Sequence, residues 1–306
     1  MDKQSKILIV GHNDIIENAL TQHFQQAGYS HVFSSSAMAL NPTIQPSVYE
    51  FFQKHRPDYV FLASTKSGGI EANMKHSAEF IYHNLESQNN IVYAAHSFGV
   101  KKLLYFAGSC IYPKVCPQPI KEEYLLTAPL EPTSEAYSIA KIAGLKLCQH
   151  YRRQYQMNNI VAIPATIYGP GSDVDLETAH VIGALIGKFS HAVQENQKEV
   201  TVWGTGKPRR EFLYVDDFVD ACFFLMDHHE KDSQINIRCG TDITIQEFTD
   251  MISDIVGFKG KIVLDSTKPD GTMQKLIDNT RITKMGWKAK VGLKEGIQKT
   301  YQWYVK

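Results

Sequence analysis

The sequence predicts an α/β protein with a doubly wound parallel sheet and a smaller, interleaved C-terminal domain. Short apolar runs alternate with helical patterns over the first half of the chain, and this alternation breaks near Ile167. Strands that alternate with helices form parallel sheets with right-handed crossovers. The later segments "YGPGSD", "WGTGKPRR" and "DSTKPDGT" are rich in Gly, Pro and Asp. Such loops commonly form a substrate pocket at the carboxyl ends of strands.

Each element of the first half has its own signal. Ile7–Val10 is a run of four apolar residues, as in a buried parallel strand. The amphipathic segment Ile15–Ala27 is predicted to be a helix that ends at Gly28, because glycine tolerates the conformation that follows a helix. The same patterns predict strands at His31–Phe33, Tyr59–Ala63, Lys102–Ala107 and Ile160–Pro164, and helices at Ser47–His55, Ala78–Phe98 and Ala136–Tyr155. We expect residues 1–166 and about 204–235 to form a Rossmann-like domain, and about 167–203 and 236–306 to form a substrate-binding domain.

The composition narrows the functional classes. Apolar residues make up 43% of the 306 residues, charged residues make up 21%, and the formal net charge is zero. A neutral chain without a run of like charges lacks the electrostatic footprint of a nucleic-acid binder. No segment approaches the roughly 18 apolar residues of a membrane span. The five cysteines lack CxxC or Cys/His ligand spacing, so we expect reduced thiols in a cytoplasmic protein and no metal site.

One predicted helix carries a possible catalytic pair. The segment "YSIAK" places Tyr137 and Lys141 at positions i and i+4, and therefore on one face of the helix. A nearby ammonium lowers the pKa of a phenol, which would let Tyr137 exchange a proton with a sugar hydroxyl or carbonyl near neutral pH. The spacing is common, and on its own a solvated lysine beside a packed tyrosine is the simpler explanation.

Longer segments around this helix carry a family resemblance. They are "GGIEAN", "AAHSFGVKKLL", "SCIYPK", "LEPTSEAYSIAKIAGLKLC", "VWGTGKPRREFLYVDD" and "STKPDGTMQKLID". Together they resemble the extended short-chain dehydrogenase/reductase family, and within it the GDP-L-fucose synthase branch. The resemblance extends from about residue 5 to the C-terminal "TYQWYVK".

The resemblance implies an enzyme that takes GDP-4-keto-6-deoxy-D-mannose, epimerises C3 and C5, and reduces C4 with NADPH. The 4-keto group acidifies the protons at C3 and C5, so a base can remove one and an acid can return one to the opposite face. The family uses a cysteine and a histidine for these transfers, and the matching residues are Cys110 and His180. Both residue types can titrate near neutral pH in a suitable site. Without the resemblance, a structural thiol and a surface histidine would be the simpler interpretation.

The resemblance also implies residues for the nucleotide-sugar end. Arg210 matches a family arginine near the pyrophosphate, and a guanidinium can bind phosphate in bidentate fashion. Lys188 stands where the family typically has arginine, so the positive charge is kept but the bidentate geometry of a guanidinium is lost. Trp203 and Lys275 match further pocket positions, and Thr166 lies in the presumed sugar pocket. The family associates through the helix that bears its Tyr and Lys, so a homodimer is expected.

The turn after the first strand departs from the family pattern. The family has G-x-x-G-x-x-G there, with glycines that let the backbone approach a dinucleotide pyrophosphate. This chain keeps Gly11, has Asn13 in place of a basic residue, and has Asp14 and Glu17 at the other two glycine positions. A carboxylate about 5 Å from a phosphate charge costs roughly 3 kcal/mol at an effective dielectric near 20. We expect Asp14 and Glu17 to form a capping box at the helix start, unless the loop has shifted and still admits a nucleotide.

Two further departures concern the same cofactor. After the second strand, a charged residue would hold a dinucleotide's ribose or 2′-phosphate, whereas this chain has Ser34, Ser35 and Ser36. The family's catalytic serine aligns with Gly108, beside Ser109. Successive strand residues point to opposite faces, so Ser109 replaces that serine only if the strand end bends. Loss of one carbonyl-polarising hydrogen bond would slow reduction roughly ten- to a thousandfold.

NADP(H) is thus the cofactor implied by resemblance, with Gly11, Asn13, Asp14 and Ser34 as its candidate contacts, but its binding is in doubt. The first hypothesis is an enzyme that epimerises a GDP-4-keto-6-deoxy sugar, with Tyr137 and Lys141 at the enolate oxygen and with C4 reduction weakened or lost. The second is a complete epimerase/reductase that uses NADPH. The third is a non-catalytic homologue that binds a nucleotide sugar or pairs with an active enzyme.

Overall fold

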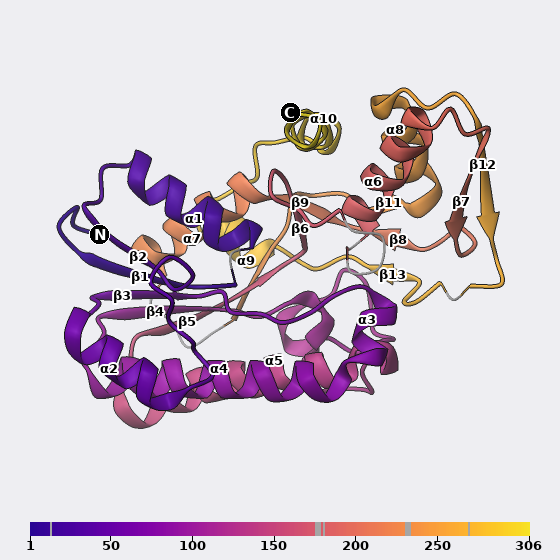
Figure 1. The fold of residues 1–306 in the computed structure, drawn as a ribbon. Helices are drawn as coiled ribbons and strands as arrows, with labels where there is room; N and C mark the ends of the chain where they lie inside the picture. Colours follow the sequence, from indigo (N-terminus) through magenta and orange to yellow (C-terminus); the bar gives the residue numbers. More distant parts are fainter. Residues whose placement is uncertain (13, 175–178, 180, 230–233, 269) are drawn as a thin grey trace.

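A six-stranded parallel sheet is the largest element of the fold (Figure 1). The structure is a computed structural model that describes residues 1–12, 14–174, 179, 181–229, 234–268 and 270–306. The strand order is β10–β5–β4–β3–β1–β2. The strands are β1 (Lys6–Val10), β2 (His31–Ser34), β3 (Tyr59–Leu62), β4 (Lys102–Phe106), β5 (Asn159–Pro164) and β10 (Gln234–Ile237). The sheet confirms the predicted doubly wound architecture.

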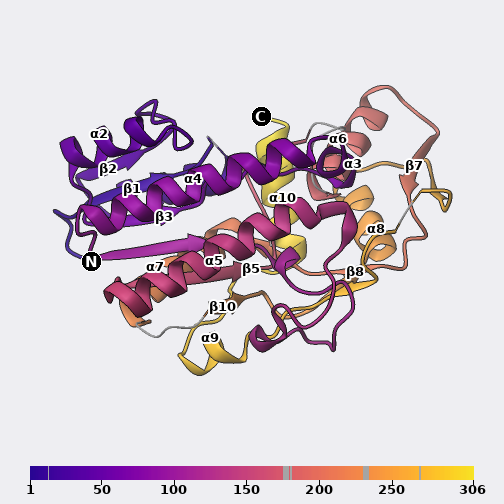
Figure 2. The ribbon, with the colours of Figure 1, turned by 90° about the horizontal axis from the view of Figure 1, so that it is seen from below.

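Helices cover both faces of this sheet (Figure 1 and Figure 2). α1 (Ile15–Gln26) and α7 (Val215–His228) pack together on one face, and α2 (Gln45–His55), α4 (Ser77–Ser97) and α5 (Glu135–Tyr155) cover the other. All five residues of β4 are buried, as expected for a strand that is covered on both faces. Within the described ranges, none of the helices is long and apolar enough to cross a membrane.

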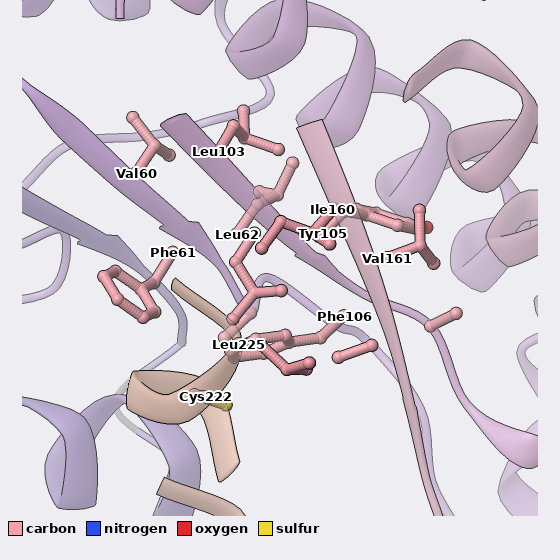
Figure 3. Close-up of a cluster of buried hydrophobic side chains, with 14 of the residues drawn as sticks. Val60, Phe61, Leu62, Leu103, Tyr105, Phe106, Ile160, Val161, Cys222 and Leu225 are labelled. Atoms are coloured by element: carbon pink, nitrogen blue, oxygen red, sulfur yellow. The ribbon is translucent and has the colours of Figure 1, made fainter. Parts of the chain in front are cut away.

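Side chains from the central strands and α7 form the main hydrophobic core (Figure 3). Phe61 on β3, Phe106 on β4 and Val161 on β5 are at most 3% exposed, and Cys222 and Leu225 of α7 belong to the same cluster. Full burial of one large apolar side chain contributes about 1.5–3 kcal/mol. This packed layer therefore fixes the strand ends that carry the candidate site.

The later part of the chain has a hydrophobic cluster of its own. This cluster joins α6 (Val181–Gln194) and α8 (Ile245–Val256) to the paired strands β7 (Glu199–Trp203) and β12 (Lys261–Asp265). The remaining elements are α3 (Ile70–Lys75), α9 (Thr280–Lys284), α10 (Leu293–Tyr304), β6 (Thr166–Tyr168), β8 (Arg209–Arg210), β9 (Phe212–Tyr214), β11 (Ile243–Thr244), β13 (Gln274–Lys275) and the 3-10 turns η1 (Ser109–Ile111), η2 (Glu122–Tyr124) and η3 (Pro132–Ser134). The division into a Rossmann-like domain and a substrate-binding domain stays a prediction.

The strand order reverses between β1 and β3, because the chain runs from β1 to the edge strand β2 and then returns to the far side of β1. In doubly wound sheets, ligands bind outside the carboxyl ends of the strands at such a switch point. A cavity of about 310 Å³ lies there, lined by His12 after β1, Thr65, Lys66 and Ser67 after β3, and His83 of α4. The fold thus places an opening where the family resemblance implies a cofactor.

Gly144 lets the helix that bears Tyr137 and Lys141 approach the sheet closely. A Cβ added at Gly144 would lie 2.5 Å from Gln88 Oε1 and against the Tyr105 hydroxyl, and those two groups hydrogen-bond each other at 2.8 Å. We expect Gly144→Ala to lower the free energy of unfolding by about 1–3 kcal/mol, because neither neighbour can withdraw freely. Urea titration would measure the loss.

Gly292 offers a matched control for this substitution. A Cβ added there meets nothing within 4 Å, and the backbone φ is −69°. Gly292→Ala should therefore change the urea midpoint little. Equal losses for the two variants would contradict the close approach at Gly144 as the cause.

Candidate active site

Lys141 is held at the carboxyl ends of two central strands. Its Nζ donates hydrogen bonds to the backbone oxygens of Ser64, which follows β3, at 3.2 Å, and of Phe106, which ends β4, at 3.1 Å. The residue is 1% exposed. Burial lowers the pKa of Lys141 to about 8, because the charged form loses solvation. The ammonium is thus anchored at the ends of β3 and β4, beside the switch point.

The prediction that Lys141 lowers the pKa of Tyr137 is wrong. The Lys141 Nζ lies 5.9 Å from the centroid of the Tyr137 ring, and its hydrogen bonds go to backbone oxygens. Burial raises the pKa of Tyr137 well above its ordinary value, and the neighbouring Cys110 raises it further. The phenol therefore stays protonated at neutral pH and can donate a hydrogen bond to a ligand oxygen.

Cys110 and Tyr137 flank one point beside Gly108. An atom added at the Cβ position of Gly108 would lie 3.4 Å from Cys110 Sγ and 3.4 Å from the Tyr137 hydroxyl oxygen. Cys110 is half-buried in the η1 turn that follows β4. Burial raises the pKa of the Cys110 thiol, while Lys275 and Lys141 oppose this rise. The structure thus brings a titratable thiol and a hydrogen-bond donor close enough together to contact the same small ligand.

The same geometry shows what the missing serine would contact. Gly108 has an extended backbone, with φ −132° and ψ 156°, which any residue adopts. A serine there would lie next to the Tyr137 hydroxyl. Ser109 begins the η1 turn and lines a different space, with Arg210 and Lys275. Replacement of the family serine by Ser109 stays a prediction.

Four predicted residues come together in one small cavity. Ser109, Thr166, Arg210 and Lys275 line a space of about 10 Å³ between the end of β4 and the strands β6, β8 and β13. The parallel pairing of β13 with β8 sets Lys275 opposite Arg210. Burial lowers the pKa of Lys275. Two neighbouring cations favour an anionic ligand group such as a phosphate.

Glu211 lines this cavity as well, and sequence analysis missed it. It is 3% exposed, lies 3.7 Å from Arg238 Nη1, and accepts a hydrogen bond from the backbone N–H of Gly240 at 3.3 Å. Burial raises the pKa of Glu211 to about 7, and the partners offset only part of this cost. In "RREF" the residue reads as one more surface charge, and only the fold reveals its burial.

Two other predicted sugar contacts make different interactions. Lys188 on α6 donates from Nζ to the backbone oxygen of Thr201 on β7 at 2.8 Å. Trp203 is 51% exposed, and the Nζ of Lys268 lies 4.9 Å from the centroid of its ring. Neither Lys188 nor Trp203 lines the small cavity beside Arg210. Their roles in substrate binding stay predictions.

Asp14 caps α1 as predicted, but Glu17 does not complete a capping box. The Asp14 Oδ1 accepts hydrogen bonds from the backbone N–H groups of Ile16 at 3.0 Å and Glu17 at 2.9 Å. The Glu17 side chain instead turns to the serines after β2, because its position on α1 faces the sheet and is buried. Asn13 lies outside the described residues, and so does His180.

Glu17 joins the altered turn to the serine run. Its Oε1 accepts hydrogen bonds from Ser34 Oγ at 2.8 Å, Ser35 Oγ at 3.0 Å and the Ser36 N–H at 3.0 Å, and its Oε2 accepts one from Ser36 Oγ at 2.5 Å. We call Glu17, Ser34, Ser35 and Ser36 the Glu17–serine cluster. A Cβ added at Gly11 would lie 2.5 Å from the Glu17 Cβ, so Gly11 makes room for this side chain. The altered turn after β1 and the serine run after β2 are separate in the sequence, but in the structure they are joined by these hydrogen bonds.

These residues do not fit the adenosine end of NADP(H). In this fold the pyrophosphate binds at the N-terminus of α1 and the ribose binds at the residue after β2. The Asp14 carboxylate already accepts hydrogen bonds from the N–H groups at the N-terminus of α1. The Glu17 carboxylate lies at the residues that end and follow β2, where the ribose would bind. As for metals, the described parts of the chain hold no group of three or more His, Cys, Asp or Glu side chains that could bind an ion.

The fold and the Tyr–Lys helix define an enzyme class. A model of the NAD dependent epimerase/dehydratase family matches residues 7–239. The chain belongs to this family, whose members are extended short-chain dehydrogenase/reductase enzymes. The resemblance seen in the sequence is confirmed, and so are the class of enzyme and its Rossmann-like sheet.

Particular relatives point to GDP-sugars. GDP-L-fucose synthase of Escherichia coli (strain K12) is 42% identical over 314 residues, which cover 100% of this chain and 98% of that protein. A GDP-6-OMe-4-keto-L-xylo-heptose reductase from C. jejuni has a TM-score of 0.94 and 34% identity, with 100% of this chain and 99% of that one covered. MlghC, a GDP-mannoheptose C4 reductase from Campylobacter jejuni solved with NADP bound, has a TM-score of 0.90 and 35% identity, with 100% of both chains covered.

These names bear on two expectations from the sequence. A synthase, a GDP-heptose reductase and a C4 reductase solved with NADP bound lie among the relatives. The names therefore favour a complete epimerase/reductase over an enzyme whose reduction is weakened or lost, and they give no support to doubt about the cofactor. Any such doubt rests on the local structure of this chain.

Proposed function

We propose that this chain acts on a GDP-linked 4-keto-6-deoxy sugar and transfers protons at C3 and C5. The proposal is supported by relatives that act on GDP-sugars according to their names. The observation that carries it is the pairing of Cys110 Sγ and the Tyr137 hydroxyl around one point beside Gly108. A base and a hydrogen-bond donor that both lie about one contact distance from the same point can act on one ketone and its neighbouring C–H bond.

The proposed proton transfer rests on this geometry for Cys110 and Tyr137, and on the family resemblance for His180. The substrate ketone oxygen accepts a hydrogen bond from the Tyr137 hydroxyl, which stays protonated because its pKa is raised. The Cys110 thiolate takes the proton from the neighbouring carbon, and the electron pair of the C–H bond moves toward oxygen to form an enolate. In the role that the family resemblance implies, His180 then gives a proton to the opposite face of that carbon. The positive charges of Lys141 and Lys275 near Cys110 favour its thiolate.

The diphosphate of the substrate would lie beside Arg210 and Lys275, which line the small cavity at the carboxyl end of β4. Arg210 and Lys275 supply two positive charges there, and a diphosphate needs such partners when it leaves water. Thr166 and Ser109 add hydroxyl groups that can bind sugar oxygens.

We also propose that the chain works in the cytoplasm as a homodimer, with the helix that bears Tyr137 at the interface between the two copies.

The fate of C4 separates two forms of this function. A complete epimerase/reductase, with NADPH, is the form that the names of the relatives favour. An epimerase with reduction weakened or lost is the form that Gly108 and the Glu17–serine cluster favour. Proton transfer at C3 and C5 is common to both forms.

Solvent exchange tests the common step. Purified protein in D₂O with GDP-4-keto-6-deoxy-mannose and without nicotinamide should incorporate deuterium at C3 or C5, which NMR and mass spectrometry detect. Addition of NADPH then reports C4 reduction as loss of its absorbance. Absence of exchange, together with binding of GDP, would favour a non-catalytic sugar-binding homologue and would overturn the proposal.

The exchange rate should rise with pH. Burial raises the pKa of Cys110 above its ordinary value, so the thiolate is a minor form at neutral pH and its fraction grows as the pH increases. Between about pH 6 and 8 we expect the logarithm of the rate to increase with a slope near one. A profile of initial deuterium incorporation that falls from pH 6 upward would argue against Cys110 as the base.

A further inference from the structure

The carboxylate of Glu17 lies at the adenosine end of the dinucleotide cleft. In a doubly wound sheet, that end is formed by the turn after β1 and by the first residues after β2. Glu17 starts from α1 and reaches Ser34, Ser35 and Ser36, which end and follow β2. It is 1% exposed, and so is Ser35. The side chain thus fills space that a ribose would need.

The hydrogen-bond donors of this region are already used by the chain itself. Two N–H groups of the α1 N-terminus point to Asp14 Oδ1. The Gly11 N–H donates to Ser35 Oγ at 2.9 Å, and the Ser36 N–H donates to Glu17. Backbone N–H groups at a helix start are what a pyrophosphate would bind in this fold. A dinucleotide would therefore have to displace two carboxylates of the protein.

Charge opposes the same ligand. The adenosine end of NADP(H) carries a 2′-phosphate, which relatives of this fold hold with arginine. From Ser34 to Ile44 the chain has no Lys or Arg, and the group that faces this position is the Glu17 carboxylate. At about 5 Å, one carboxylate weakens the binding of one phosphate charge roughly a hundredfold. Asp14 adds to this repulsion at the pyrophosphate.

We infer that the Glu17–serine cluster and Asp14 replace the adenosine end of a dinucleotide, so that NADP(H) is excluded from the cleft in the form that the structure shows. The cavity of about 310 Å³ lined by His12, Lys66 and His83 is what remains of that cleft. The inference goes beyond the proposed function, because proton transfer at C3 and C5 needs no dinucleotide. It can fail while the exchange reaction stands, and the reverse also holds.

Ligand binding tests the inference without any turnover. Isothermal titration and thermal shift would use NADPH, NADH, 2′,5′-ADP as a probe of the adenosine end, and GDP. The wild-type chain should show no saturable binding of NADPH or 2′,5′-ADP up to about 1 mM and should be stabilised by GDP. The double variant Asp14→Gly, Glu17→Gly should bind both adenosine ligands at least a hundredfold more tightly than the wild type does.

A second variant guards against loss of folding. Glu17→Gln keeps the size of the side chain and removes its charge, so we expect at least a tenfold gain in affinity for 2′,5′-ADP. The response to GDP should be the same in all three proteins and shows that each is folded. Saturable binding of NADPH to the wild-type chain would overturn the inference, and so would variants that respond to GDP but gain no affinity for NADPH.

Discussion

Replacement of Cys110 by serine should slow deuterium incorporation at C3 and C5 by about 10²–10⁴-fold, the range that a positioned base contributes. A serine hydroxyl has nearly the size of the thiol but is a far weaker acid, so it cannot supply an anionic base at neutral pH. The position beside Tyr137 would be kept, because the hydroxyl is no larger than the thiol that it replaces. Initial rates of exchange, measured by mass spectrometry at saturating ketosugar, would report the loss.

Cys116 supplies the matched control for this prediction. It is also half-buried, burial also raises the pKa of its thiol, and Lys275 also opposes that rise. Its Sγ lies 3.7 Å from the backbone oxygen of Pro113, on the loop after η1. Cys116→Ser should leave exchange and GDP binding unchanged, and equal losses for both serine variants would argue against a specific role of Cys110.

Tyr137→Phe should lower the exchange rate about 10²–10³-fold, as expected when one donor to a developing oxyanion is removed. The raised pKa of Tyr137 makes its hydroxyl a donor at neutral pH, and an enolate oxygen needs such a donor more than the ketone does. The loss should therefore fall on the rate at saturation, with a smaller change in the substrate concentration at half-saturation.

Tyr155 lies on the same helix and provides the comparison. It is 47% exposed and packs on His96, with ring centroids 4.3 Å apart. Tyr155→Phe should leave exchange unchanged. If Tyr137→Phe retained full exchange while binding GDP normally, the enolate oxygen would have to be held by another group.

The architecture was predictable because its signals are local. Apolar runs and helical patterns depend on neighbours in the chain, and each predicted strand ends within one residue of the observed one. The pairing of Lys275 with Arg210 across β13 and β8 could not be derived in this way, since it joins short segments far apart in the sequence. The family resemblance supplied those two residues instead.

The errors in the candidate site have one physical origin. The spacing of Tyr137 and Lys141 predicts that they share a helix face, but it does not predict how far burial outweighs a neighbouring charge. Glu17 likewise satisfies a local capping pattern, yet the serines after β2 offer its carboxylate more donors. Long-range contacts decide both cases, and a pattern of spacing within one helix does not contain them.

The Glu17–serine cluster also bears on how this chain can evolve. Loss of Glu17 alone removes an acceptor of Ser34 and Ser36, although Ser35 also donates to the Gly11 backbone oxygen at 3.1 Å. Loss of the serines alone leaves a buried carboxylate short of donors, at about 1–3 kcal/mol for each unsatisfied buried group. A change at Glu17 alone, or at the serines alone, is therefore destabilising. The mutual dependence of these four side chains thus favours retention of the present turn, independently of any ligand.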